Sequence, residues 1–297
     1  MGGDTAPRWL GLGTAPLGGL HRAVDEHEAV TAIDRAWELG IRVFDTAPYY
    51  GSGLAESRLG LALRGRPRAD FVVSTKVGRR LEPGRSGWHG APRLRAYFDF
   101  SYDGALRSLE ESLERLGLDN VDVALVHDPD DHYAEATSGA FRALRRLREE
   151  GSVKRIGVGM NRSELLCRFA EESDPDCFLV AGRLTLLDRS ATERLLPLCL
   201  ERGIGLIVGG VFNSGVLAGG STFDYAQVGG EVAQRAERLE EIARRRGVPL
   251  AAAAVQFPMR YQGIETVLVG CASANEVEDD VRLAGVAIPA RLWGELE

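Results

Sequence analysis

Residues 121–159, VDVALVHDPDDHYAEATSGAFRALRRLREEGSVKRIGVG, contain one complete strand–helix–strand repeat. Its two ends, 121–126 and 156–159, are short apolar runs of the kind that form strands buried on both faces. Between them, residues 134–150 place an apolar side chain about every third position among arginines and glutamates, which predicts an amphipathic helix. Repeats of this kind build a parallel sheet, either closed into a barrel or open and doubly wound.

The same alternation runs along the chain. Apolar runs predict eight strands, at 9–12, 41–44, 71–75, 121–126, 156–159, 178–181, 204–208 and 266–269. Helical periodicity predicts helices at 26–39, 55–63, 102–116, 134–150, 163–172, 192–202, 231–246, 250–260 and 275–284. No linker-like stretch divides residues 1–297, so we expect a single (β/α)₈ TIM barrel domain.

A glycine-rich stretch near the N-terminus tests the open-sheet alternative. Gly11-Leu-Gly13 resembles the start of a dinucleotide fingerprint, but Pro16 stands where the third glycine belongs and no helix opens there. An open dinucleotide-binding sheet is therefore disfavoured, and a barrel that binds its cofactor by other means fits better.

Two long segments interrupt the repeat. Residues 77–101 follow the third strand and residues 211–230 follow the seventh, and we expect both to be irregular loops. Loops after barrel strands lie at the C-terminal face, where barrel active sites are found. Such loops are usually lids or binding loops, although a tolerated surface insertion is the alternative.

Composition limits the classes of partner. The formal charge of −7 argues against binding to nucleic acid or to an anionic membrane surface, because both need a basic face. The chain has four scattered cysteines and no Cys-x-x-Cys pair, so neither a metal site nor a disulfide framework is expected. The first eight residues are too polar for a signal peptide, and no apolar run approaches the ~20 residues that span a bilayer. We expect a soluble cytoplasmic protein that is a monomer or a small homo-oligomer.

Ionisable residues follow three consecutive predicted strands. Asp45, Lys76 and His127 each come after an apolar run, and Tyr50 lies five residues beyond Asp45. Each alone has a structural explanation, such as a turn cap or a solvated charge. Together they would meet at the C-terminal face of a barrel. Only two of the 36 basic residues are lysines, Lys76 and Lys154, which hints that Lys76 does something arginine cannot.

The motifs around these residues resemble the aldo-keto reductases in order and spacing. They are FDTAPYYG (44–51), STKVG (74–78) and LVHDPD (125–130). Further segments resemble the bacterial branch that contains sugar 1-dehydrogenases, such as the D-threo-aldose and L-fucose enzymes: GTAPLG (13–18), GVGMN (157–161) and GGVFNSG (209–215). The resemblance extends along essentially the whole chain. It implies an oxidoreductase that interconverts an alcohol and a carbonyl or lactone.

The resemblance also implies catalytic roles. Tyr50 is expected to be the general acid in reduction and the general base in oxidation. A free tyrosine has a pKa of ~10, and the ammonium of Lys76 is expected to lower that pKa. Asp45 would keep Lys76 charged and oriented, while His127 would hydrogen-bond the substrate oxygen. Tyr49 is the competing phenol, but the family pattern puts the catalytic tyrosine directly before glycine.

A nicotinamide cofactor is what the resemblance implies, since neither a metal site nor a flavin fingerprint is evident. Asn161 matches the family position that holds the nicotinamide carboxamide, although a turn-forming asparagine is the alternative. The loop that covers the pyrophosphate would contribute Phe212, Asn213, Ser214, Gly215 and Leu217. The adenosine pocket would be formed by Gly270, Ser273, Glu276, Asp279 and Asp280.

That last pocket departs from the pattern that prefers NADP. The lysine expected near Gly270 is missing, Ala272 replaces a frequent arginine, and an acidic residue, Glu276, stands where arginine is expected. A 2′-phosphate would meet no cation and one carboxylate, so NAD is expected over NADP.

The sequence constrains the small-molecule substrate less. The candidates for its pocket are His21, Trp88, Arg183 and Leu184. Leu184 occupies a position where relatives tend to carry tyrosine, which leaves room for a bulkier or less polar molecule, including a ketone or aldehyde intermediate of biosynthesis. Two other hypotheses stay open: a catalytically silent nucleotide-binding barrel that serves as a regulatory subunit, and a lyase or isomerase that uses the same polar residues.

Overall fold

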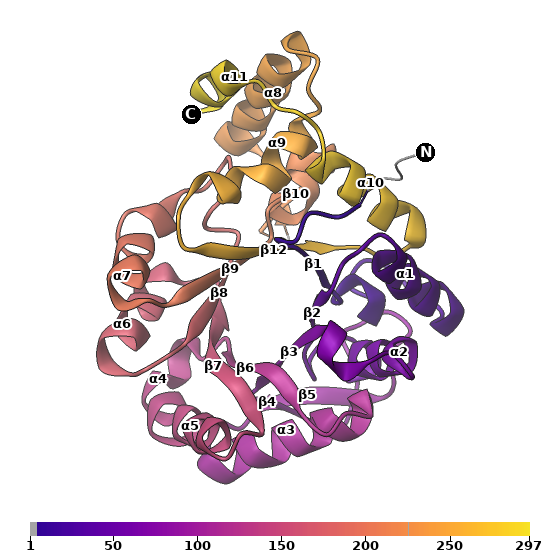
Figure 1. Ribbon diagram of the computed structural model, residues 1–297, viewed down its shortest axis with the longest axis vertical. Coiled ribbons are helices and arrows are strands. Elements are labelled where there is room, and N and C mark those ends of the chain that lie inside the picture. Colours follow the sequence, from indigo (N-terminus) through magenta and orange to yellow (C-terminus); the bar gives the residue numbers. More distant parts are fainter. Residues whose placement is uncertain (1–4, 225) are drawn as a thin grey trace.

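A closed barrel of parallel strands forms the centre of the computed structural model, which describes residues 5–224 and 226–297. The eight strands are hydrogen-bonded in the order β1-β12-β9-β8-β7-β6-β3-β2, and β1 closes the barrel by pairing with both β12 and β2. Their bounds are β1 Leu10–Gly13, β2 Val43–Asp45, β3 Val72–Val77, β6 Val121–His127, β7 Val153–Met160, β8 Cys177–Ala181, β9 Gly205–Gly209 and β12 Ile264–Gly270. The predicted barrel fold is confirmed (Figure 1).

Helices surround the barrel as an outer ring (Figure 1). Their bounds are α1 Glu26–Glu38, α2 Leu54–Leu63, α3 Tyr102–Leu116, α4 Tyr133–Glu135, α5 Phe141–Glu149, α6 Ser163–Glu172, α7 Leu195–Arg202, α8 Gly230–Arg245, α9 Leu250–Gln256, α10 Ala274–Ala284 and α11 Ala290–Leu296. The helix predicted at 134–150 is α4 and α5 joined by a π-helical turn, Ala136–Ala140. Helix α11 was not predicted, and it packs beside α8.

Local side chains fix where the helices begin. Asp25, Ser101 and Ser273 each accept a hydrogen bond from a backbone N–H in the first turn of α1, α3 and α10. These bonds satisfy donors that a helix start otherwise leaves unpaired. Gly117 ends α3 in the left-handed conformation, with φ of 63°.

Apolar side chains fill both the barrel and the layer around it. A small cluster of buried side chains comes entirely from barrel strands: Val123, Leu125, Cys177, Leu179, Ile207 and Leu268. A larger cluster packs the strands against the helices. The four cysteines are buried and free, and burial raises the pKa of the Cys177 and Cys199 thiols to about 12. Within the described residues, no helix combines the length and apolarity needed to cross a membrane.

Long segments follow the third and seventh barrel strands, as predicted, but both contain short regular elements, so the expectation that they are irregular was wrong. Segment 77–101 holds an antiparallel hairpin, β4 Arg79–Pro83 and β5 Leu94–Phe98. Segment 211–230 holds a 3₁₀ turn, Asn213–Ala218, and a short hairpin, β10 Thr222–Phe223 and β11 Ala226–Gln227. The strands of the first hairpin are partly buried and mix charged with apolar residues, and those of the second are only two residues long, which is why the sequence pattern did not reveal them. Both segments follow barrel strands at the C-terminal face, as predicted.

Candidate active site

Two adjoining cavities open at the C-terminal ends of the barrel strands. The first, here the Trp88 cavity, has a volume of about 340 Å³ and is lined by Tyr50, Lys76, Trp88 and His127 among others. The second, here the Phe212 cavity, has a volume of about 300 Å³ and is lined by Phe212, Asn213 and Gly270 among others. The two share Ala15, Leu20, Tyr50, Asn161, Leu179 and Ala181, so they are two lobes of one cleft.

A buried ion pair lies at the base of this cleft. Lys76, near the end of β3, places its Nζ 2.7 Å from Oδ2 of Asp45 and 2.8 Å from the backbone oxygen of Thr46. The two side chains are only 1% and 5% exposed. Burial by itself lowers the pKa of Lys76, but Asp45 and Tyr50 outweigh it, and the pKa lies above its ordinary value. Lys76 is therefore a fixed positive charge.

Tyr50 is the phenol that this charge faces. Nζ of Lys76 lies 4.6 Å from the centroid of the Tyr50 ring. Burial raises the pKa of Tyr50 to about 12. The positive charge of Lys76 lowers this pKa and the negative charge of Asp45 raises it, so Lys76 offsets only part of the effect of burial. The expectation that Lys76 leaves Tyr50 with a lowered pKa is thus not met in this structure. Tyr50 is a neutral phenol at neutral pH.

His127 completes the group. Its ring packs edge-on against Tyr50, with centroids 5.7 Å apart. Burial, together with the charges of Lys76 and Arg79, holds the pKa of His127 well below its usual range. The imidazole is therefore neutral, so it acts as a hydrogen-bonding group rather than as a cation. Nδ1 is buried and has no hydrogen-bond partner among the described residues.

Close backbone packing sets the position of Tyr50. A Cβ on Gly18 would lie 2.8 Å from the backbone carbon of Tyr50, and a Cβ on Gly51 would lie 2.4 Å from the oxygen of Gly18. Gly51 also has a φ of 63°, which favours glycine. Arg58 of α2 is buried and donates hydrogen bonds to the backbone oxygens of Leu17 and Val24, which ties the first loop to the Tyr50 turn.

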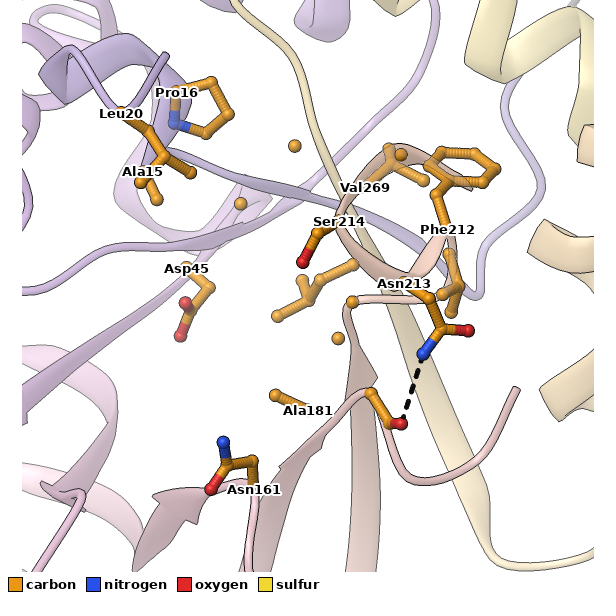
Figure 2. Close-up of a pocket in the computed structure, with 18 of the residues that line it drawn as sticks. Ala15, Pro16, Leu20, Asp45, Asn161, Ala181, Phe212, Asn213, Ser214 and Val269 are labelled. Atoms are coloured by element: carbon orange, nitrogen blue, oxygen red, sulfur yellow. Dashed lines mark hydrogen bonds between the residues drawn. The ribbon is translucent and has the colours of Figure 1, made fainter. Parts of the chain in front are cut away.

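Most of the predicted cofactor residues line the Phe212 cavity. Those that do are Asn161, Phe212, Asn213, Ser214, Gly215 and Gly270. Figure 2 shows Phe212, Asn213 and Ser214 along one side of this cavity, with Asn161 and Ala181 on another. Asn213, Ser214 and Gly215 all have positive φ, at 46°, 61° and 111°, so the chain turns sharply here. Leu217 lies instead in the core, and it lines neither cavity.

The remaining predicted cofactor residues lie at and after the start of α10. Ser273 caps the helix, and the carboxylate of Glu276 accepts a hydrogen bond of 2.7 Å from the backbone N–H of Ala272. Asp279 is exposed and pairs with Arg282. Asp280 is largely buried and accepts a hydrogen bond from Sγ of Cys271, and burial raises the pKa of its carboxyl to about 7.

The guanidinium of Arg22 interacts electrostatically with Glu276 in the first turn of α10. The charge of Glu276 helps to raise the pKa of Arg22, although the hydrogen bond to Glu28 contributes most. The Arg22 guanidinium is thus already paired with a carboxylate.

The predicted substrate residues divide into two groups. Trp88 lines the Trp88 cavity and packs edge-on against Tyr49, while His21 lines the Phe212 cavity. Arg183 lines neither, because its guanidinium pairs with Asp188 and Asp224 and donates to the backbone oxygen of Asn161. Leu184 is 0% exposed and lies in the core, so it cannot shape the pocket directly.

Among the residues that the sequence analysis did not predict is an ion pair beside His127. Asp128 lines the Trp88 cavity, and Arg79, on the β4–β5 hairpin, pairs with it at 2.7 Å. The signal for Asp128 was its place directly after His127, within the LVHDPD motif (125–130). Arg79 gave no signal, because its segment was expected to be irregular. Among the described residues, no group of three or more histidine, cysteine or acidic side chains is arranged to hold a metal ion.

Comparisons with known proteins identify the family of this chain. The model of the aldo/keto reductase family matches residues 9–297. The chain is 41% identical to a pyridoxal 4-dehydrogenase of Microbacterium luteolum and 42% identical to a D-threo-aldose 1-dehydrogenase of a Pseudomonas species, in each case over 97% of this chain and 92% of the relative. Among solved structures, an aldo-keto reductase from Bacillus halodurans in its holo form superposes with a TM-score of 0.79 at 26% identity, covering 97% of this chain and 90% of that one.

Proposed function

The chain belongs to the aldo/keto reductase family and is an NAD(P)-dependent oxidoreductase, and we propose that it oxidises the anomeric hydroxyl of an aldose to the lactone with NAD. The observation that carries this proposal is the contact of the Lys76–Asp45 ion pair with Tyr50 in a cavity that also holds His127. A proton-transfer group, a fixed charge and a neutral imidazole in one cleft are the parts that a carbonyl–alcohol interconversion needs.

Tyr50, Lys76 and His127 have separate roles in this reaction. In oxidation the phenolate form of Tyr50, a minority at neutral pH, takes the proton of the anomeric hydroxyl at Oη, and in reduction the neutral phenol donates that proton to the carbonyl oxygen. Lys76 stabilises the phenolate that forms, because its ammonium is held against the ring by Asp45. Neutral His127 hydrogen-bonds the reacting oxygen and orients it toward Tyr50. When bound, the oxidised nicotinamide supplies the hydride acceptor.

The Phe212 cavity and α10 would hold that cofactor. Asn161 lies in both lobes, so its amide can reach a nicotinamide placed beside Tyr50. The preference for NAD rests on Glu276, whose carboxylate is fixed at the start of α10, and on Arg22, whose charge Glu28 already neutralises. A 2′-phosphate brought to this helix start would meet an uncompensated carboxylate.

The test is an assay of the purified protein against a panel of aldoses, pyridoxal and simple aldehydes, with NAD and NADP supplied separately. We expect formation of NADH with at least one aldose, with the lactone as product. Turnover of pyridoxal and of no aldose would show that the substrate resembles that of the pyridoxal 4-dehydrogenase relative and is not a sugar. Cofactor binding without turnover on the whole panel would favour a silent regulatory barrel, and product without cofactor reduction would favour a lyase or isomerase.

A further inference from the structure

Asp128 is a carboxylate in the Trp88 cavity that the reaction described above does not use. Among the described residues that line this cavity it is the one acidic side chain, and its neighbours there include Tyr49, Trp88 and Met160. Its side chain is 32% exposed, so it is open to the cavity rather than enclosed by protein. Asp128 also has a φ of 43°, an uncommon conformation for a residue other than glycine, and such strain clusters at functional sites.

The two carboxylate oxygens of Asp128 are not equivalent. Oδ2 accepts a hydrogen bond of 2.7 Å from Nη2 of Arg79 and lies 3.5 Å from Nε2 of His127. Within residues 5–224 and 226–297, Oδ1 accepts no hydrogen bond. One oxygen therefore anchors the carboxylate beside the imidazole, and the other is free to accept from a bound molecule.

Arg79 keeps this carboxylate in place. Its guanidinium lies 4.7 Å from the centroid of the Tyr49 ring and 5.2 Å from that of Phe98, so two aromatic rings fix the counter-ion. Burial, together with the charge of Asp130, raises the pKa of Asp128 above its ordinary value, and the charges of Arg79 and Lys76 offset only part of that rise. The 2.7 Å ion pair with Arg79 is the geometry of a carboxylate rather than of a neutral acid. An ionised carboxylate only accepts hydrogen bonds, so its partner must be a donor.

We propose that Asp128 is a specificity-determining residue, whose Oδ1 accepts a hydrogen bond from the hydroxyl on the carbon next to the one that is oxidised. The inference rests on the proposed function, because it takes His127 to hold the reacting oxygen. Oxygens on neighbouring carbons of a sugar are about one hydrogen-bond length apart. A hydroxyl beside an oxygen held by His127 therefore falls within reach of a carboxylate 3.5 Å from the same imidazole.

The rest of the cavity suits the same substrate. Trp88 packs against both Tyr49 and Tyr50, with ring centroids 5.1 Å and 5.9 Å away, and presents an aromatic wall. Such a wall covers the C–H groups of a sugar ring while Asp128 takes the hydroxyl. The substrate class is then a neutral aldose with a hydroxyl at C2. A 2-deoxy sugar leaves Oδ1 without its donor, and an acidic sugar brings a second negative charge.

The test compares sugars with and without that hydroxyl. The pairs are L-fucose, D-glucose and D-ribose with their 2-deoxy analogues, assayed with the wild type and with Asp128→Asn. Asparagine is nearly isosteric and tolerates positive φ, so the fold should survive. Asp130→Asn is the matched control. It also removes one negative charge, but from a side chain two residues further along the chain that lines neither cavity. Thermal unfolding and NADH binding check the integrity of each variant.

In the wild type we expect kcat/KM to fall about ten- to hundred-fold from a parent sugar to its 2-deoxy analogue, as for a lost hydrogen bond to a charged group. Asp128→Asn should reduce this ratio to within about threefold, through a raised KM for the parent sugar, whereas Asp130→Asn should leave it unchanged. Comparing the ratio between variants cancels the intrinsic reactivity of each sugar.

Two results would overturn the inference. If Asp128→Asn lowers both members of a pair equally, Asp128 only positions His127. If the wild type turns over a parent sugar and its 2-deoxy analogue equally well, no side chain forms a productive hydrogen bond with the C2 hydroxyl. Failure of the wild type to turn over any parent sugar would remove the proposed function itself, and this inference with it.

Discussion

Nζ of Lys76 lies 2.7 Å from Oδ2 of Asp45, with both side chains almost completely removed from water. A buried pair of this kind couples stability to function, because neither charge can be removed without leaving the other unpaired in a low-dielectric interior. The same contact holds the ammonium against Tyr50. Changes to this pair therefore affect both folding and proton transfer.

Replacing Lys76 by methionine should destabilise the fold strongly. The substitution leaves the Asp45 carboxylate buried without its counter-ion, which typically costs about 3–5 kcal/mol. Lys154→Met is the matched control, because the other lysine is 70% exposed and its buried partner Asp122 keeps a second ion pair with Arg68, so the loss should be about 1 kcal/mol or less. Urea unfolding of both variants measures the difference. Equal losses of free energy in the two would show that burial of the Lys76–Asp45 pair has no special cost.

Replacing Tyr50 by phenylalanine should abolish turnover without abolishing cofactor binding. Loss of a general acid–base group lowers kcat by about 10²–10⁴-fold. Tyr49→Phe removes the neighbouring phenol from the same cavity and should change kcat by only a few-fold. Steady-state kinetics and NADH titration provide the two readouts. A larger loss of kcat in Tyr49→Phe than in Tyr50→Phe would show that Tyr49, and not Tyr50, transfers the proton.

The oxidative reaction should accelerate as the pH rises. Burial raises the pKa of Tyr50 to about 12, so the phenol is protonated at neutral pH and the fraction able to accept a proton grows about tenfold per pH unit below that pKa. The reductive reaction needs the protonated phenol and should stay level over the same range. Burial keeps the pKa of His127 well below its ordinary value of 6.5, so protonation of His127 should cause no change in rate near neutral pH.

Profiles of kcat/KM from about pH 6 to about pH 10 in both directions test this expectation. An oxidative profile that levels off near neutral pH would mean that the complex lowers the pKa of Tyr50 far below its value in the free protein.

Introducing a cation at the start of α10 should shift cofactor preference. Glu276→Arg replaces a fixed carboxylate with a group that pairs with a 2′-phosphate, and the ratio of NADP to NAD affinity should rise at least about tenfold. Glu276→Gln removes only the negative charge and should give a smaller shift in the same direction. Fluorescence titration with each cofactor measures both ratios. An unchanged ratio in Glu276→Arg would place the adenosine phosphate away from this residue.

Much of the fold could be predicted because its signal is local. Each barrel strand is an apolar run bounded by polar residues, and each ring helix repeats at helical spacing, so the strands were placed within a few residues. The β4–β5 and β10–β11 hairpins lack that signal, because their strands are short or only partly buried and their pairing depends on which segments the barrel brings together. Sequence motifs likewise predicted Asp45, Tyr50, Lys76 and His127, which the structure brings together.

Charge state and side-chain direction depend on neighbours distant in the chain. The amino-acid order places ionisable groups directly after consecutive strands, and since a parallel barrel puts all such strand ends on one face, their meeting could be predicted. Packing between distant segments, which no local pattern encodes, makes burial outweigh Lys76 in raising the pKa of Tyr50 and turns Leu184 into the core. It alone also paired Arg79 with Asp128, 49 residues apart, since desolvation and ion pairing depend on packing in three dimensions.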